Sequence, residues 1–273
     1  MIHIGIDPNL FYVGSMPIGW HGIMVVLAVV VGVVASLWRA RGSAVQRDVI
    51  FGLAPWAIIG GVIGARLVHV IDYIPLYAGN PAQILQFWVG LSIFGAILGG
   101  TLAAVIYARV TGTKLGQLAD VVAPALILAQ AVGRIGCTIN GDAFGIETTL
   151  PWAFVYTHPD AYAMLGVPTH PSPVYEIIWD LLVFGLLLRL SGRLKPDGSL
   201  FLLYLSLYSL GRFAIEFTRA LPNPGIQISV GPLHEAHFIA LLVMAVCIPL
   251  LIRNMRQARR AAIPTPDAGL PPA

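Results

Sequence analysis

The stretch QLADVVAPALILAQAVGRIGC runs from Gln117 to Cys137, and its only charged side chains are Asp120 near its start and Arg134 near its end. A helix that crosses a membrane needs about 20 mostly apolar residues, and this stretch has that length and character. A guanidinium group stays charged at any working pH, and hydrocarbon is a costly environment for a charge. The stretch therefore predicts a transmembrane helix whose arginine has a functional or pairing role.

The composition of the whole chain supports a membrane location. Of its 273 residues, 57% are hydrophobic and 11% are charged, whereas soluble domains usually have about 25% charged residues. The two cysteines, Cys137 and Cys247, are far apart and form neither a metal-binding nor a disulfide spacing. We expect an integral membrane protein that has no metal and no cofactor.

Seven stretches are apolar and long enough to cross a bilayer, so we predict an all-α integral membrane fold with seven transmembrane helices. They are roughly 18–38, 49–74, 88–110, 117–137, 174–190, 200–219 and 233–252. The polar segment 138–173 is expected to form a small periplasmic cap. We predict one domain over 1–260 and a disordered cytoplasmic tail over 261–273, which is rich in proline and alanine.

The basic residues predict the orientation, because lysine and arginine gather in cytoplasmic loops. Twelve of them lie at or beyond the C-terminal ends of the first, third, fifth and seventh predicted helices: Arg39, Arg41, Arg47, Arg109, Lys114, Arg189, Arg193, Lys195, Arg253, Arg256, Arg259 and Arg260. The loops on the other side have none. The N-terminus is therefore expected outside and the C-terminus in the cytoplasm.

Four arginines remain, and all fall in the outer half of predicted helices: Arg66, Arg134, Arg212 and Arg219. An arginine at mid-membrane costs about 2.5–3.5 kcal/mol on insertion scales. One explanation is ion pairing, since Arg212, Glu216 and Arg219 are spaced to lie on one helix face. The other is an anion site open to the outer leaflet, because arginine forks match phosphate oxygens. The abundant anion there is a phospholipid headgroup, and four arginines at one level favour this second explanation.

Several motifs resemble those of the prolipoprotein diacylglyceryl transferases, in the family's order and over most of the chain. They are DVVAPALILAQAVGRIGCTINGDAFG (Asp120–Gly145), GARL (Gly64–Leu67), HPSPVYE (His170–Glu176), YSLGRFAIEFTR (Tyr208–Arg219) and, less closely, GLSIFGAILGG (Gly90–Gly100). The resemblance implies a seven-helix enzyme of the bacterial inner membrane. Its members transfer the diacylglyceryl group of phosphatidylglycerol to the lipobox cysteine of a prolipoprotein, forming a thioether and releasing glycerol-1-phosphate.

The resemblance also implies roles for individual residues. Arg134 and Arg212 match the family's essential arginines, which contact the phospholipid and its reacting phosphate. The expected supporting and substrate-binding residues are Arg66, Tyr208, Asn140, Gly145, Glu216, Arg219 and His170. A structural role at the start of the fifth helix is the alternative for His170, with Ser172 as the helix cap.

This chain departs from the family pattern at several positions. Phe94 replaces a histidine, His21 a tyrosine, Cys137 an asparagine and Asp142 a glutamate. Because Phe94 cannot accept a proton, we hypothesise that His21 partly replaces the missing base as a catalytic residue. A diverged lipid-binding paralogue, without catalysis or with another specificity, is the alternative function.

Other classes fit less well. A retinal protein needs a lysine inside a helix, and both lysines, Lys114 and Lys195, fall in loops. An anion channel or transporter would place basic residues through the full membrane depth, and here they stop in the outer half. The loop arginines are too scattered for nucleic-acid binding. The expected partners are phosphatidylglycerol, a prolipoprotein lipobox peptide and membrane lipids.

Overall fold

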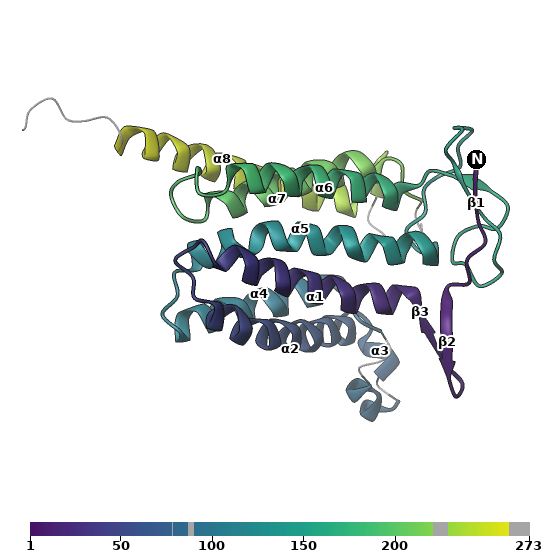
Figure 1. Cartoon of the computed structure of the whole chain (residues 1–273). Coiled ribbons are helices and arrows are strands. Elements are labelled where there is room, and N and C mark those ends of the chain that lie inside the picture. The colour runs from purple at the N-terminus through teal and green to yellow at the C-terminus, as the bar shows by residue number, and fades with distance from the viewer. Residues whose placement is uncertain (78, 87–89, 221–228, 262–273) are drawn as a thin grey trace, which may run out of the picture. The chain divides into compact units, whose positions relative to one another are not determined.

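The computed structural model describes residues 1–273 except 78, 87–89, 221–228 and 262–273 (Figure 1). The helices are α1 (Trp20–Ala40), α2 (Arg47–Asp72), α3 (Ile74–Tyr77), α4 (Ile93–Val110), α5 (Leu115–Asn140), α6 (Ser172–Leu190), α7 (Ser199–Glu216) and α8 (Glu235–Ala261), with a 3-10 helix, η1 (Pro81–Leu85). The short strands are β1 (Ile2–Ile4), β2 (Asn9–Val13), β3 (Met16–Gly19), β4 (Phe154–Tyr156), β5 (Pro168–Thr169), β6 (Ser229–Val230) and β7 (Leu233–His234). The predicted tail lies almost entirely outside the described residues, as does the predicted start of the third helix.

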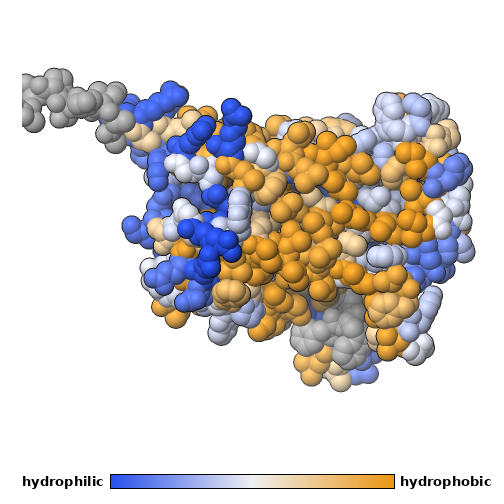
Figure 2. Space-filling view, in the orientation of Figure 1, coloured by the Kyte–Doolittle hydropathy of each residue, from blue (hydrophilic) through white to orange (hydrophobic). Residues whose placement is uncertain are grey.

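Among the described residues, five helices are long and apolar enough to cross a membrane: α1, α2, α4, α5 and α8. Their surfaces agree with this, since Val26, Val30 and Val34 on α1 are each more than half exposed. Such a row of exposed apolar side chains is unfavourable in water and normal against lipid. Figure 2 shows apolar side chains along α6 and hydrophilic ones toward the C-terminal end of α8. The chain is therefore a multi-pass helical membrane protein.

Helices α6 and α7 cover the predicted fifth and sixth spans and have charged residues within their length. Glu176, Asp180 and Arg189 lie on α6, and Arg212 and Glu216 lie on α7. These charged side chains lower the apolar character of both helices, which are otherwise of sufficient length. Several of these charged residues belong to the site described below.

The described chain forms two compact units, one of Met1–Gly32 with Val122–Ala273 and one of Val33–Val121. In the second unit, α2 and α4 pack closely through glycines. A Cβ added at Gly64 would lie 2.3 Å from the carbonyl oxygen of Gly95, and one at Gly99 would lie 2.2 Å from that of Gly60. Only glycine allows two helix backbones to approach this closely.

In the first unit, the core is formed by three helices. Ala123 and Ile127 of α5 pack with Val183 and Leu187 of α6 and with Leu200 and Tyr204 of α7. Helix α8 packs against α7, and α1 approaches α5, where a Cβ added at Gly32 would lie 3.4 Å from the Cβ of Ala129. This packing brings the C-terminal ends of α5 and α7 close to the N-terminal end of α6.

The segment predicted as a cap contains a small sheet that the sequence did not predict. Strand β1 pairs in parallel with β4, and β4 pairs antiparallel with β5. Strands β2 and β3 form an antiparallel hairpin that leads into α1. The N-terminus is thus tied to the segment between α5 and α6, where the Met1 ammonium donates to the Pro151 carbonyl at 2.5 Å.

Candidate active site

Glu176, near the start of α6, binds three arginines from other parts of the first unit. Its Oε1 accepts from Nη1 of Arg212 at 2.8 Å and from Nη1 of Arg219 at 3.1 Å. Its Oε2 is paired with Nε of Arg134 on α5. Glu176 is buried, with 4% of its surface exposed. A carboxylate can be buried in this way because its charge is paired and hydrogen-bonded.

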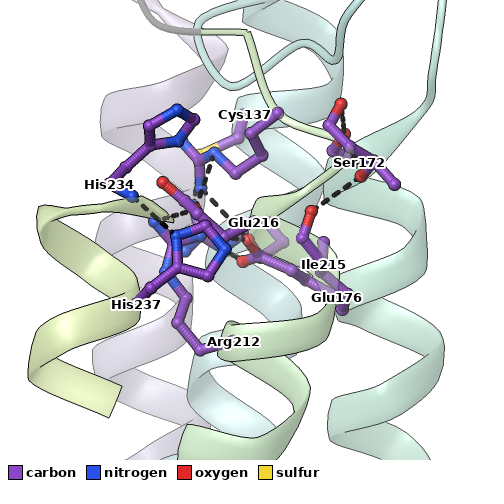
Figure 3. A network of polar contacts seen from close by, with 11 residues as sticks. Cys137, Ser172, Glu176, Arg212, Ile215, Glu216, His234 and His237 are labelled. Carbon is purple, nitrogen blue, oxygen red and sulfur yellow. Dashed lines mark hydrogen bonds and ion pairs between the residues drawn. The ribbon is translucent and has the colours of Figure 1, made fainter. Parts of the chain in front are cut away.

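Glu216 is the second carboxylate of this cluster (Figure 3). Its Oε2 lies 2.8 Å from Nη2 of Arg212 and 3.8 Å from Nε of Arg219. These are the ion pairs that the spacing on one helix face predicted. Among the residues of these ion pairs, three guanidinium groups against two carboxylates leave one surplus positive charge. The arginine side chains remain partly exposed, at 17–23%, so a further anion can reach them.

Two contacts between α6 and α7 position these charges. The indole of Trp179 on α6 lies against Gly211 on α7 and donates to the carbonyl of Leu207 at 2.9 Å. Ser172 donates its hydroxyl to the carbonyl of Thr218 at 3.1 Å. These contacts hold Glu176 level with Arg212. The predicted capping role of Ser172 is wrong, because Pro171 occupies the cap position without a side-chain bond and the serine hydroxyl is used by Thr218.

Gly145 lies where the loop after α5 passes between the start of α6 and the end of α7. Its N–H donates to the carbonyl of His170 at 2.9 Å, and the N–H of Ile146 donates to that of Thr218 at 2.9 Å. A Cβ at Gly145 would lie 2.4 Å from the Cβ of His170 and 2.5 Å from the Thr218 oxygen. Glycine is therefore required here, and the predicted residue has a clear structural role in placing Arg219.

A second polar group lies where α1 begins and α5 ends. His21 Nδ1 is 3.2 Å from Oδ2 of Asp142 and 3.8 Å from Sγ of Cys137. Nη1 of Arg134 is also 3.8 Å from this sulfur, so the two polar groups adjoin. The helices approach here because residue 136 is glycine, where a Cβ would lie 3.0 Å from the Cα of His21 and 2.9 Å from the Cβ of Met24.

The remaining predicted residues of the first unit surround these groups. Asn140 donates to Asp142 Oδ2 at 3.0 Å. His170 and Tyr175 are 3.3 Å apart, from Nδ1 to the hydroxyl, and the Trp152 indole donates to the same hydroxyl at 2.9 Å. Tyr208 is half-buried, and its ring centroid lies 6.2 Å from that of Tyr204. Their roles toward a substrate stay predictions.

Tyr156 fixes the loop beside the second group. Its hydroxyl donates to the carbonyl of Thr138 at 2.8 Å. Burial raises the pKa of this phenol, so it stays protonated and keeps donating. The contact joins strand β4 to the last turn of α5, which supports Cys137 and Asp142.

Arg66 and Phe94 belong to the second unit. The Arg66 guanidinium donates to the carbonyls of Ile84 at 2.8 Å and Gly90 at 3.0 Å, and also to that of Gln83. These bonds hold the segment before α4, so Arg66 has a structural use, and its role in phospholipid binding stays a prediction. Phe94 lies in the first turn of α4 and is 45% exposed.

In the sequence, Glu176 was only the last residue of the motif HPSPVYE, and Cys137 and Asp142 were separate departures from a motif. No spacing could reveal their contacts, since His21 and Cys137 are 116 residues apart. The expectation of no metal was based on the spacing of possible ligands along the chain. The fold, however, brings three possible ligands together: His21, Cys137 and Asp142.

Comparisons with known proteins show the family to which this chain belongs. The family model described as prolipoprotein diacylglyceryl transferase matches residues 8–253. The phosphatidylglycerol–prolipoprotein diacylglyceryl transferase of Dehalococcoides mccartyi is 40% identical over 261 residues, which cover 95% of this chain and 98% of that protein. The enzyme of the same name from Trichormus variabilis is 40% identical over 86% of this chain and 84% of its own. That from Listeria welshimeri is 34% identical over 90% of this chain and 89% of its own.

The fold and site thus define a multi-pass membrane protein with a buried arginine–glutamate cluster that has a surplus positive charge. The chain belongs to the prolipoprotein diacylglyceryl transferase family. The resemblance found in the sequence motifs is confirmed.

Proposed function

We propose that this chain transfers the diacylglyceryl group of phosphatidylglycerol to the lipobox cysteine thiol of a prolipoprotein. The observation that supports this most strongly is the cluster of Arg134, Arg212 and Arg219 on two buried glutamates. A phosphodiester headgroup has one negative charge, which matches the surplus positive charge. The partly exposed guanidinium groups offer the donors that a phosphate accepts.

The chemistry makes two demands. The acceptor thiol loses its proton, because thiolate is the nucleophile. The thiolate then attacks the glycerol carbon, the carbon–sulfur bond forms and the carbon–oxygen bond to phosphate breaks. Glycerol-1-phosphate leaves with that electron pair, so negative charge builds on the phosphate. Fixed guanidinium groups stabilise this charge without rearranging, and their effect is greatest in a site of low dielectric.

The proposed roles follow the geometry. Arg134 and Arg212 contact the phosphate, while Arg219, Glu216 and Glu176 hold them in place. Tyr208, Asn140, Gly145 and His170 support the site and the substrate. The role of Arg66 in binding the phospholipid stays a prediction from the sequence motif. His21 activates the acceptor thiol, since its Nδ1 faces Cys137 and the Arg134 side of the site.

A lipid-binding paralogue without catalysis is the second candidate function. The observation that favours it is Phe94, which cannot accept a proton where the family pattern has a histidine. The two candidates differ in one result, which is whether labelled lipid becomes covalently attached to an acceptor peptide.

The proposed topology has seven transmembrane helices in the bacterial inner membrane, with the N-terminus outside and residues 1–260 as one domain. An impermeant thiol reagent tests it. Cysteine placed at Tyr162, in the predicted periplasmic cap, should be labelled in intact cells, and cysteine at Lys195 should not. Cys137 and Cys247 are buried and give the background. The reverse labelling pattern would contradict the topology.

Complementation tests the activity in cells. The chain should restore growth and lipoprotein modification in a bacterium depleted of its own diacylglyceryl transferase, and an Arg212→Ala variant at equal abundance should not. Failure of the parent chain, with normal membrane insertion, would favour the binding paralogue.

A further inference from the structure

His21, Cys137 and Asp142 place three different metal-ligating atoms around one point. The sulfur, the imidazole nitrogen and a carboxylate oxygen all lie within 4.8 Å of one another. Nδ1 of His21 is 3.8 Å from the sulfur and 3.2 Å from Oδ2 of Asp142. The three atoms come from the first turn of α1, the last turn of α5 and the residue pair that follows α5.

The sulfur–nitrogen and nitrogen–oxygen separations fit tetrahedral coordination. Zinc bonds of about 2.3 Å to sulfur and about 2.0–2.1 Å to nitrogen and oxygen put sulfur and nitrogen about 3.6 Å apart and nitrogen and oxygen about 3.4 Å apart. The observed separations lie within a few tenths of an ångström of both values. A shift of that size needs only small side-chain rotations.

The same geometry does not fit a nucleophilic Cys–His–Asp triad. In a triad, one imidazole nitrogen faces the nucleophile and the other faces the carboxylate. Here Nδ1 faces both, so the imidazole does not stand between the thiol and the acid. Three donors that converge on one point are the arrangement of a metal site.

The hydrogen bonds of the Asp142 carboxylate are also consistent with a metal site. Asn140 donates to Oδ2 of Asp142 at 3.0 Å and orients the carboxylate, as second-shell groups do at metal sites. Oδ1 of Asp142 is buried and has no hydrogen-bond partner among the described residues. A divalent ion that the carboxylate bound through both oxygens would also give Oδ1 a partner.

The charges also balance. A divalent cation with a thiolate, a carboxylate and a neutral imidazole has no net charge, so its presence beside Arg134 costs little. Arg134 is itself paired with Glu176. Soft thiolate together with imidazole selects zinc and its neighbours over magnesium or calcium.

We propose that His21, Cys137 and Asp142 bind one divalent transition-metal ion of the zinc class and leave a fourth coordination position open. Three protein ligands with an open position are the pattern of catalytic rather than structural zinc. The open position adjoins Arg134, whose Nη1 is 3.8 Å from Sγ of Cys137.

The open position takes the acceptor thiol, an extension that rests on the proposed function. The thiol binds through sulfur and releases its proton to solvent, because a metal-coordinated thiol is deprotonated outright. The bound thiolate attacks the glycerol carbon of the lipid, the carbon–oxygen bond breaks, and glycerol-1-phosphate leaves with the electron pair. His21 then acts as a metal ligand and not as a general base. The reaction therefore does not require a base at the position of Phe94.

Cobalt(II) gives a readout that does not depend on activity. The purified chain, stripped of metal with a chelator, is titrated with Co²⁺ in detergent. We expect one ion per chain, visible bands of a tetrahedral site and a near-ultraviolet thiolate-to-cobalt band, all displaced by Zn²⁺. Cys247→Ser should keep every band, and since the chain has two cysteines, the thiolate band of that variant can come only from Cys137.

Variants of the proposed ligands, with a matched control, test which residues bind cobalt. Cys137→Ser should lose the thiolate band, and His21→Gln and Asp142→Asn should weaken cobalt binding at least ten-fold. His158→Gln is the matched control, because His158 lies in an exposed group with Asp7 and Asp160 that has no thiol. If the Cys247→Ser variant shows no thiolate band, the metal site is wrong. This variant keeps all three proposed ligands, so a disrupted cluster cannot explain the missing band.

A lipobox peptide separates the metal site from the transfer activity. A peptide with cysteine should shift the cobalt spectrum, and the same peptide with serine should not. Transfer that proceeds at full rate after chelation, without cobalt binding, overturns the metal site and leaves the proposed function standing. Cobalt binding without any transfer overturns the proposed function and leaves the metal site standing.

Discussion

The carboxylate of Glu176 and the guanidinium of Arg212 form a 2.8 Å ion pair between α6 and α7. This carboxylate also pairs with Arg134 and Arg219, so one buried acid sets the positions of three basic groups. The cluster retains a positive charge because its arginines outnumber its acids. We attribute the binding of the lipid phosphate to that excess.

Replacing Glu176 by glutamine keeps the shape of the side chain and removes its charge. Three arginines would then share only Glu216, and breaking a buried ion pair typically costs about 3–5 kcal/mol. We expect a thermal unfolding midpoint several degrees lower in detergent and a large loss of transfer. Glu147→Gln, at an exposed position in the loop after α5, is the control. Equal stability of the two variants would show that Glu176 is not the centre of the cluster.

Replacing Arg134 by lysine keeps the charge and loses the planar fork. A phosphate held by two parallel N–H bonds would be held by one group, and the ion pair with Glu176 would change its geometry. We expect the transfer rate to fall roughly a hundred-fold, the usual loss for one transition-state donor. Arg193→Lys, in the loop between α6 and α7, should not change the rate. A parent-like rate in Arg134→Lys would mean that the charge alone matters there.

Replacing Gly145 by alanine tests the contact between the loop after α5 and the two helix ends. The added Cβ would lie 2.4 Å from the Cβ of His170 and 2.5 Å from the Thr218 oxygen, and both belong to fixed chain segments. We expect reduced stability and a displaced Arg219, seen as a lower unfolding midpoint and weaker lipid binding. Gly185→Ala on α6 has open space at its Cβ among the described residues and should be neutral or stabilising.

Replacing Gly136 by alanine should separate α1 from α5. A Cβ there would lie 2.9 Å from the Cβ of Met24 and 3.0 Å from the Cα of His21, so α1 must move outward. The proposed metal ligands on the two helices would then separate, and cobalt affinity should fall. Gly133→Ala lies one turn earlier on α5 and has open space among the described residues. If both variants bind cobalt equally well, the close helix contact is not what forms the cluster.

The sequence predicted the helices well because apolar length is a local property. The fifth and sixth predicted helices, 174–190 and 200–219, compare with α6 at Ser172–Leu190 and α7 at Ser199–Glu216. The difference at the end of α7 has a tertiary cause, since Arg219 leaves the helix to pair with the backbone of Gly145. Periodicity within one helix contains no information about such a partner.

The sequence predicted many residues of the candidate site but few of the contacts between them. The pairs of Arg212 and Arg219 with Glu216 followed from spacing along one helix. The contacts of Glu176 did not, because its partners lie on other segments of the chain. His21, Cys137 and Asp142 were noted as separate departures from a motif, and only the packing of α1 on α5 places them in one cluster.

The most direct test of the central claim is the mass of an acceptor peptide. The purified chain is incubated with phosphatidylglycerol and a lipobox peptide, with a cysteine-to-serine peptide and an Arg212→Ala variant as controls. We predict that the cysteine peptide gains one diacylglyceryl group through a thioether, that glycerol-1-phosphate appears in equal amount, and that neither control reacts. Lipid binding by the parent chain with no mass change in the cysteine peptide would contradict the account.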